Sequence, residues 1–308
     1  PSFADALSEQ ERWALANFIK SLQHQLTNHQ VLRALEIEGK ISQDPGEANW
    51  LAAESMDVRL TGQVVAAPRW QNPSIELVTV RALYNLEEIA FLIEWDDPFK
   101  DELHQSGIEF DPQEISRMGA FNSYVAANDV VPRQLETFRD AIALQFPVKL
   151  PEGTKKPHFF RGDSSNPVHL WQWRSDGVEN SAQAVQESNA RGWKQPAKVQ
   201  PGENQQVDAV ASWNQGRWSV IMRRPLLTDD RNDIQFVKGR FIPLALNAWD
   251  GSNGEHGLIM SLSTWHSVIL EAPVPIKIYL YTLLAVVASG ALGLWLVRKE
   301  RRRVAAVG

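Results

Sequence analysis

Short runs in which apolar residues recur at every second position constrain the fold of this chain more than any other feature. From Trp218 to Arg223 the large apolar side chains alternate with other residues, and a second apolar run, Phe241 to Trp249, follows a polar turn. A period of two is typical of β-strands. A glycine-rich loop, 250–257, then leads to Met260 and the sequence Ser-Leu-Ser-Thr-Trp.

The same pattern recurs through most of the chain. Strands are predicted at 58–66, 75–84, 89–95, 141–146, 168–173, 218–222 and 241–249. Asn85 to Glu88 separates two of these runs with polar residues and predicts a hairpin turn. The spacing favours a mainly β fold, an antiparallel β-sandwich. Residues 31–40 are predicted to extend an amino-terminal helix, while Asp101–Pro132 and Arg174–Val207 are predicted to be surface insertions that bury little.

Three of these segments together form a recognisable signature. They are Arg224-Pro225-Leu226, the alanine-containing strand that ends in Trp249-Asp250-Gly251, and the glycine-rich loop that closes on Ser261 to Trp265. The chain resembles the haem-binding γ subunits of ethylbenzene dehydrogenase and its relatives, which accompany molybdenum enzymes of the dimethyl sulfoxide reductase family. The resemblance covers roughly Val58 to Leu270, and it implies a haem-binding sandwich of the DOMON type.

Composition narrows the function classes. The chain has no cysteine, which excludes disulfides, thiolate metal sites and covalent c-type haem attachment within its 308 residues. The formal charge is -6, and the run from Arg298 to Arg303 contains basic residues at all positions but one, so the rest of the chain is more acidic than this total. An acidic body without a basic groove argues against a nucleic-acid partner. Twelve tryptophans fit a bulky cofactor, a sugar-binding face or simply an aromatic core.

Both ends of the chain carry separate signals. Residues 1–45 are predicted to be a helical segment with a capping box at Ser8 to Glu11, and residues 1–22 resemble the closing helix of a cytochrome c. That resemblance implies a haem c in a preceding domain. Residues 46–272 are then the haem b sandwich, and 273–308 a membrane anchor with a basic tail.

The anchor prediction rests on length and apolarity. Ile278 to Val297 is a run of 20 residues without charge, long enough to cross the roughly 30 Å hydrocarbon core of a bilayer. The basic run from Arg298 to Arg303 follows it, so the carboxyl terminus is expected in the cytoplasm and the large domain on the periplasmic side of the inner membrane.

The resemblance also implies where a haem iron binds. The family's axial ligands are a methionine before a glycine and a lysine in the glycine-rich loop; here Met260 occupies the lysine position, and Phe160 or Arg161 the methionine position. Met260 is therefore one predicted iron ligand. His158 is the candidate on the other side, because residues 158 and 160 share a face of an extended strand, with His256 as the alternative. Phe160, Arg161, Trp171 and Trp265 complete the predicted cofactor site.

Other acidic groups look unremarkable in sequence. Asp96-Asp97, Asp229-Asp230 and Asp233 match no twelve-residue calcium loop, and they are interpreted as turn-forming residues. No motif of a hydrolase, P-loop or zinc protease is present, so an active site is not indicated.

Two functions follow from these patterns. The first is a membrane-anchored, non-catalytic electron-transfer subunit with haem b, relaying electrons between molybdopterin and iron-sulfur subunits and a c-type cytochrome or quinone pathway. The partner's substrate stays open among nitrate, nitrite, chlorate, selenate, dimethyl sulfide and hydrocarbons. The alternative is a carbohydrate-type ligand-binding module without redox activity.

Overall fold

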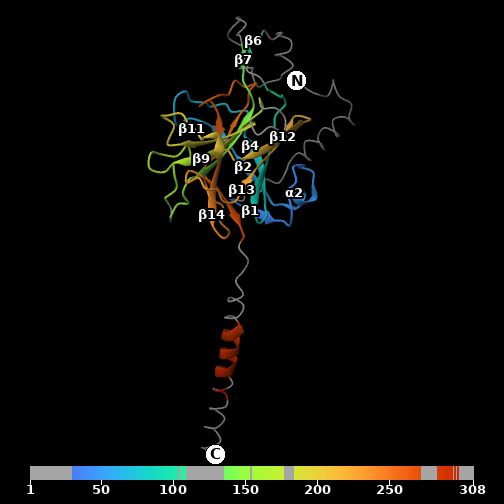
Figure 1. Ribbon diagram of the computed structural model, residues 1–308, viewed down its shortest axis with the longest axis vertical. Coiled ribbons are helices and arrows are strands. Elements are labelled where there is room, and N and C mark those ends of the chain that lie inside the picture. Colours follow the sequence, from blue (N-terminus) through green and yellow to red (C-terminus); the bar gives the residue numbers. More distant parts are fainter. Residues whose placement is uncertain are drawn as a thin grey trace, which may run out of the picture. The chain divides into compact units, whose positions relative to one another are not determined.

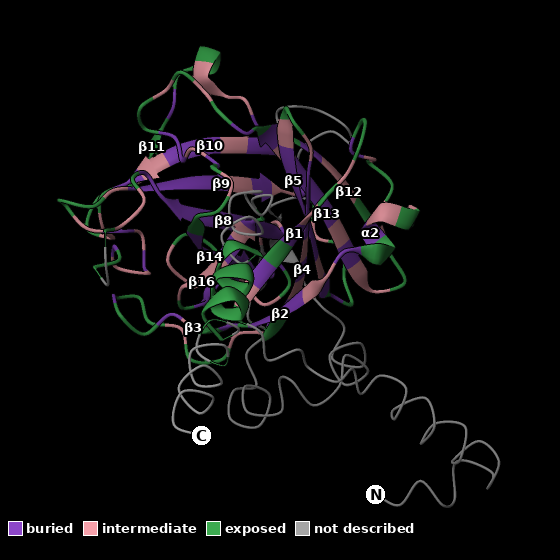
Figure 2. Cartoon of the chain, turned by 90° about the horizontal axis from the view of Figure 1, so that it is seen from below, coloured by how far each residue is buried: buried purple, intermediate pink, exposed green. Residues whose placement is uncertain are grey.

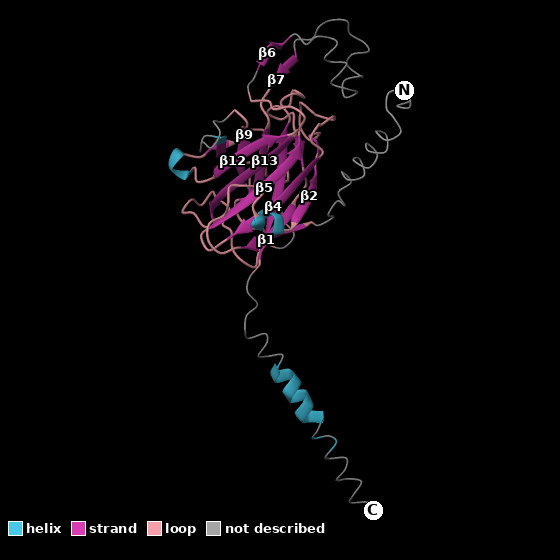
Figure 3. Cartoon of the chain, turned by 90° about the vertical axis from the view of Figure 1, so that its right-hand side faces the viewer, coloured by secondary structure: helices cyan, strands magenta, loops and turns pink. Residues whose placement is uncertain are grey.

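The structure is a computed structural model that describes residues 30–102, 105–108, 135–152, 155–176, 184–271, 283–293, 295 and 297. The chain divides into two units, residues 1–270 and 271–308, which are considered separately. Figure 1 traces the elements along the chain, and Figure 3 shows that the first unit consists mainly of strands.

The described elements are mostly short strands. They are β1 (Val31–Glu36), α2 (Ala48–Ala52), β2 (Ser55–Arg59), β3 (Thr61–Gly62), β4 (Leu77–Tyr84), β5 (Glu88–Asp96), β6 (Gln105–Ile108), β7 (Leu135–Thr137), β8 (Ala141–Pro147), β9 (Val168–Arg174), β10 (Val185–Ala190), β11 (Lys198–Val199), the 3₁₀ helix η3 (Gly202–Asn204), β12 (Asp208–Asn214), β13 (Arg217–Pro225), β14 (Phe241–Trp249), β15 (Ser261–Leu262) and β16 (His266–Leu270).

Most of these strands follow one continuous path, β11-β10-β9-β8-β14-β16-β1-β4-β5-β13-β12. The two ends of the path pack on each other as layers, because strands that are far apart along it touch through their side chains. Phe91 of β5 lies 5.7 Å from Phe146 of β8, and Trp95 of β5 lies 6.1 Å from Trp173 of β9, between ring centroids. Figure 2 shows the buried strands around this interior. Each large apolar side chain buried here stabilises the fold by about 1.5–3 kcal/mol.

Several predicted strands are confirmed. β14 has the predicted bounds, and β4, β5, β8, β9 and β13 match to within a few residues. The hairpin turn is also confirmed, since Asn85 Oδ1 accepts the backbone N–H groups of Glu87 and Glu88, both at 2.8 Å. β4 and β5 pair in antiparallel register on either side of it.

The helix predicted for residues 31–40 is wrong. Residues 31–36 form β1, which pairs in parallel with β16 on one side and with β4 on the other. Leu32 and Ala34 are buried and their neighbours are less so, which is the period of a strand. The sheet is therefore mixed, and the prediction of a purely antiparallel sandwich is corrected accordingly.

The surface insertion predicted for Arg174–Val207 is also wrong in part. Residues 177–183 lie outside the described residues, but β10 pairs with β9 along its whole length. Glu187 and Ala190 of β10 are fully buried. This polar strand stays in the interior because its buried polar groups have partners, which are described below.

The structure describes less of the two ends of the chain than of the sandwich. Residues 1–29, which include the cytochrome c-like segment, and most of the predicted insertion at 101–132 lie outside the described residues. In the second unit, residues 283–293 are helical. No helix within the described residues combines the length and apolarity needed to cross a bilayer.

Candidate functional site

An apolar cluster lies on the outer face of the layer that contains β8 and β14. Strand alternation creates it: Ile142 and Leu144 of β8 face the interior, whereas Ala141 and Ala143 face outward and leave room for larger side chains. This Met260 cluster comprises Ala66, Ala141, Ala143, Phe160, Trp249, Met260 and Leu262, with the partly buried Phe159, Trp193 and Leu258 packed against it.

Met260 is 0% exposed and is fixed by its backbone. Its carbonyl oxygen accepts the N–H of Gln63 at 3.0 Å, and the Gln63 side-chain amide donates to the carbonyl oxygen of Leu258 at 3.0 Å. Gln63 thus ties the 63–66 segment to the end of the glycine-rich loop. The structure therefore brings Met260 and Phe160 together, as the resemblance implies.

His158 borders this cluster from a separate segment. Its ring stacks on Phe159 at 4.7 Å and lies 5.3 Å from Trp193, between centroids. Its Nδ1 accepts the N–H of Phe160 at 3.1 Å. A neutral imidazole that accepts at Nδ1 carries its proton on Nε2, so in this arrangement Nε2 has no lone pair to offer a metal.

His256 has the opposite tautomer. Its Nδ1 lies 2.9 Å from the carbonyl oxygen of Gly254, which can only accept, so Nδ1 carries the proton. In a neutral ring with this tautomer, Nε2 keeps its lone pair. Metal-binding histidines commonly donate their second N–H to a backbone carbonyl in this way. The ring also stacks on Phe138, 3.9 Å away at 19°.

A cavity of about 420 Å³ opens beside His256. Its lining residues are Phe138, Arg139, Ala141, Arg161, Gln172, Arg174, Trp249, Glu255, His256 and Gly257. Ala141 and Trp249 also belong to the Met260 cluster, so the cavity and the cluster share a wall. The volume lies within the range of small-molecule sites, about 300–1,000 Å³.

Three arginines give the cavity a cationic rim. Arg139 and Arg174 both pair with Asp176, at 2.5 and 3.3 Å. Arg161 pairs with no carboxylate in the described part of the chain; its guanidinium donates to the carbonyl oxygen of Gly257 at 3.4 Å, and burial lowers its pKa. A guanidinium without a carboxylate partner suits a carboxylate or phosphate of a ligand.

Arg161 is held in place by its backbone. It has a positive φ of 58°, a conformation that a non-glycine residue rarely adopts. Gln145 supports it, because Oε1 of Gln145 accepts the N–H of Arg161 at 3.1 Å while Nε2 donates to the carbonyl oxygen of Phe159 at 2.7 Å.

Glu255 also lines the cavity, and its side chain is buried. Burial raises its pKa to about 7, although hydrogen bonds from Asn253 and Trp70 oppose that shift. Sequence reasoning did not single out this residue.

The remaining predicted residues lie elsewhere. Trp265 donates from Nε1 to the carbonyl oxygen of Pro157 at 2.7 Å, so it anchors the segment that carries His158. The structure does not bring Trp171 into the site. Trp171 faces the interior between the layers, where it contacts Phe91, Phe146 and Phe236, because it shares the strand face of His169.

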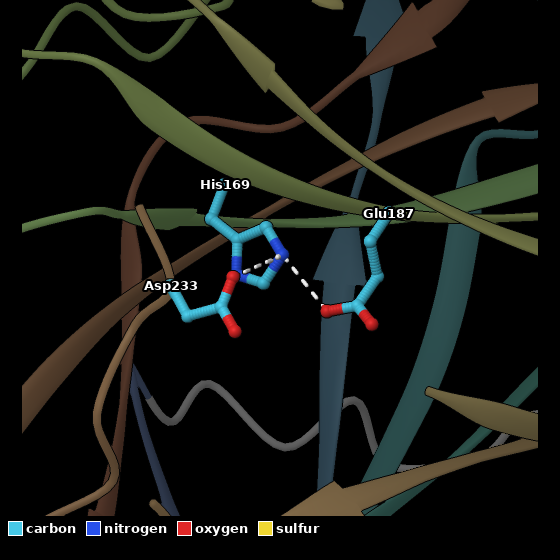
Figure 4. Close-up of side chains that lie close together, drawn as sticks. All are labelled: His169, Glu187 and Asp233. Atoms are coloured by element: carbon cyan, nitrogen blue, oxygen red, sulfur yellow. Dashed lines mark ion pairs between the residues drawn. The ribbon is translucent and has the colours of Figure 1, made fainter. Parts of the chain in front are cut away.

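Arg224, the arginine of the signature, belongs to a buried network of polar side chains rather than to the cavity. Figure 4 shows His169 between Glu187 and Asp233, with Nε2 at 3.0 Å from Glu187 Oε2 and 3.5 Å from Asp233 Oδ1. The guanidinium of Arg224 completes the network, since its Nη1 lies 3.8 Å from Glu187 and 3.5 Å from Asp233. Burial lowers the pKa of Arg224, and the two carboxylates oppose this.

The ring of Trp171 covers this network. The Arg224 guanidinium carbon lies 5.1 Å from the Trp171 ring centroid, a cation–π distance. The side chains of His169, Glu187, Asp233 and Arg224 have almost no exposure, so the two carboxylates depend on the guanidinium and on the imidazole for their partners. Asp233 is therefore part of a buried network, and its interpretation as a turn-forming residue is incomplete.

These features define a β-sandwich with a ligand cavity and an apolar cluster on one outer face. Residues 47–199 and 190–261 match the family described as ethylbenzene dehydrogenase. The chain belongs to this family.

Individual relatives agree with that assignment. The chain is 25% identical over 224 residues to a Haloferax mediterranei protein named as a respiratory nitrate reductase heme subunit, ORF7, covering 73% of this chain and 67% of the relative. It is 29% identical over 127 residues to chlorate reductase subunit gamma of Ideonella dechloratans, covering 41% and 48% respectively. This chain thus spans about half of the second relative.

A solved structure also aligns. It is a family 9 carbohydrate-binding module from Caldicellulosiruptor kristjanssonii in complex with glucose, with a TM-score of 0.39 and 6% identity over 80% of this chain and 97% of that one.

Proposed function

We propose that this chain is a haem b-binding electron-transfer subunit of a molybdenum-enzyme respiratory complex. The observation that carries the proposal is the combination at the cavity: an imidazole whose Nδ1 faces a backbone carbonyl, a guanidinium that pairs with no carboxylate among the described residues, and an adjoining apolar cluster that contains Met260. The names of the two relatives, a nitrate reductase heme subunit and a chlorate reductase gamma subunit, support it.

The donor set fits a haem. Met260 offers a thioether and His256 an imidazole nitrogen, both of which bind haem iron in other proteins. Arg161 is placed to bind an anionic propionate, and Trp249 supplies an apolar wall. The haem would supply one-electron chemistry through its iron. The protein's own contribution is to orient the group, exclude water and set the iron's electronic environment through these side chains.

Met260 and His256 are the residues that would hold the haem iron. Phe159, Trp193 and Leu258 pack against the cluster that contains the fully buried Met260, so side chains of this cluster would have to move for Met260 to reach an iron. His256 is preferred to His158 because its hydrogen bond to Gly254 leaves Nε2 unprotonated, whereas that of His158 does not.

The first test is an absorption spectrum of the purified chain. We expect a Soret band and, after reduction, α and β bands, with a haem that organic solvent extracts because the chain has no cysteine for covalent attachment. A folded but colourless preparation from haem-sufficient cells would contradict the proposal. It would return attention to the carbohydrate alternative, although six of the tryptophans, Trp50, Trp95, Trp171, Trp173, Trp218 and Trp249, are buried and offer no stacking face.

We further propose that the partners are a molybdopterin subunit and an iron-sulfur subunit, with electrons passing to or from a c-type cytochrome or quinone pathway. Residues 273–308 are proposed as a single-pass anchor of the inner membrane with a cytoplasmic tail. The apolar run Ile278 to Val297 and the basic run after it support this placement.

Protease treatment of intact spheroplasts tests the placement. We expect an external protease to remove the sandwich while a tag after Gly308 stays protected until the membrane is permeabilised. Protection of the sandwich in intact spheroplasts would show the opposite orientation. Recovery of the whole chain in the soluble fraction would contradict the proposal that residues 273–308 anchor it.

A further inference from the structure

Three aspartates converge where three strands end. Asp97 follows β5, Asp140 precedes β8 and Asp250 follows β14. Each offers a carboxylate oxygen within 4.8 Å of the other two. They are 1%, 0% and 5% exposed, so water does little to separate their charges.

A fourth carboxylate stands beside them. Asp101 donates its backbone N–H to Asp140 Oδ2 at 2.8 Å, and repulsion from Asp250 contributes to raising its pKa to about 6, after burial as the main cause. Asp97 Oδ2 and Asp101 Oδ2 are both buried, and neither accepts a hydrogen bond from a residue that the structure describes. Two carboxylate oxygens are thus left without a partner at the same place.

No ion pair within the described part of the chain balances the charge of this group. Among the residues that the structure describes, no lysine or arginine pairs with Asp97, Asp101, Asp140 or Asp250. The contrast with the network in Figure 4 is direct, because there Arg224 and His169 face the two buried acids. Burial and the neighbouring carboxylates accordingly raise the pKa of Asp97 to about 9, and burial raises that of Asp140 to about 8.

We propose that Asp97, Asp140 and Asp250, with Asp101 at the rim, form a binding site for one divalent cation of the calcium type. The donors are all carboxylate oxygens, which hard cations prefer, and the absence of histidine and cysteine from the group disfavours zinc and copper. Calcium accepts six to eight oxygens in irregular geometry, whereas magnesium demands a near-octahedral set. The carboxylates come from the ends of strands in two layers, and calcium tolerates such an irregular set of ligands better than magnesium does.

Such an ion would fasten the base of the glycine-rich loop. Asp140 Oδ1 accepts the N–H of Gly251 at 2.9 Å, and Gly251 accepts the N–H of Phe138 at 3.0 Å. A Cβ on Gly251 would lie 2.1 Å from the carbonyl oxygen of Phe138, which explains the glycine. The turn that the ion stabilises begins the loop that carries His256 and Met260, but the site itself does not depend on haem.

Calcium binding to the full chain, stripped with EDTA, tests the site. We expect titration calorimetry to give one site per chain with Kd below about 1 mM, and added calcium to raise the melting temperature by several degrees. Terbium is an independent probe: Trp218 donates from Nε1 to Asp140 Oδ2 at 3.1 Å, so terbium luminescence excited through tryptophan should appear and calcium should abolish it.

Matched variants localise the effect. Asp97→Asn should weaken calcium binding at least about tenfold, as loss of a ligand group does, yet melt in EDTA no lower than the wild type because the amide removes repulsion at constant volume. Asp96→Asn is the control, since its side chain is 84% exposed and pairs with Arg217; it should bind calcium like the wild type. The proposal is overturned if the wild type binds neither calcium nor terbium, if magnesium binds instead, or if Asp97→Asn binds calcium unchanged. Binding of calcium and terbium by the wild type is measured first. That measurement alone can overturn the proposal, even if a variant does not fold.

Discussion

Replacing Arg224 with leucine is expected to lower the free energy of unfolding by about 3–5 kcal/mol, the usual cost of leaving buried charges without their partner. Glu187 and Asp233 would lose their guanidinium and keep only the imidazole of His169 beside them. The variant would also lose the hydrogen bond from Arg224 Nη2 to the carbonyl oxygen of Ile234, at 2.5 Å, and the contact with Trp171. Urea denaturation of the sandwich measures the change.

The neighbouring arginine provides the control. Arg223 lies on the same strand but pairs at the surface with Asp208, whose side chain is more than half exposed. Arg223→Leu should therefore change stability by less than about 1 kcal/mol. A triple variant, Arg224→Leu with Glu187→Gln and Asp233→Asn, should recover part of the loss because the unpaired charges are gone. Equal effects of the Arg223 and Arg224 single variants would show that the buried network does not stabilise the fold.

The alternation of apolar and other residues predicted the strands that bury one face. It failed where a run of apolar residues fits the period of a helix as well as that of a strand. Residues 31–37 contain five apolar side chains in a run that fits either a helical or an extended period. What decides the matter is pairing: β1 fills the gap between β16 and β4, which are distant in sequence. Tertiary context of this kind overrides local preference and is not visible in a single segment.

β10 was missed for a different reason. Its sequence, Val-Gln-Glu-Ser-Asn-Ala, is polar, and polarity normally indicates exposure. Glu187 is buried because partners far along the chain satisfy it: Oε1 accepts the backbone N–H groups of Gln206 and Val207, and Oε2 faces His169. Only the assembled fold provides that compensation.

The candidate site was predictable in part. Met260 and Phe160, which the resemblance put at one predicted site, lie in the same apolar cluster. Strand alternation in β9 puts Trp171 on the same face as His169 and Trp173, opposite to Leu170. The choice between His158 and His256 needed the hydrogen bonds of their Nδ1 atoms, which no sequence contains. The acidic cluster was hidden because its members are separated by more than forty residues each, although every one flanks a strand.

The largest functional effects are expected from the proposed iron ligands. His256→Ala should convert a six-coordinate, low-spin haem into a high-spin form or lose the haem, because no other unprotonated imidazole nitrogen lines the cavity among the described residues. His158→Ala is the matched control from the rival segment and should leave the spectrum unchanged. The reverse result, with His158→Ala changing the spin state, would show that the tautomer seen here inverts on haem binding.

Met260 variants complete the assignment. Met260→Ala should remove the thioether and shift the midpoint potential downward by on the order of 0.1 V, well inside the range of about 0.8 V that axial ligands span. Met260→Lys, which restores the residue type of the resembled family, should lower the potential while keeping six-coordinate iron, since an amine stabilises ferrous iron less than a thioether does. Leu262→Ala tests mere packing, because Leu262 lies in the same buried cluster but has no ligand atom. If Leu262→Ala moves the potential as far as Met260→Ala, the cluster acts by excluding water rather than by binding iron.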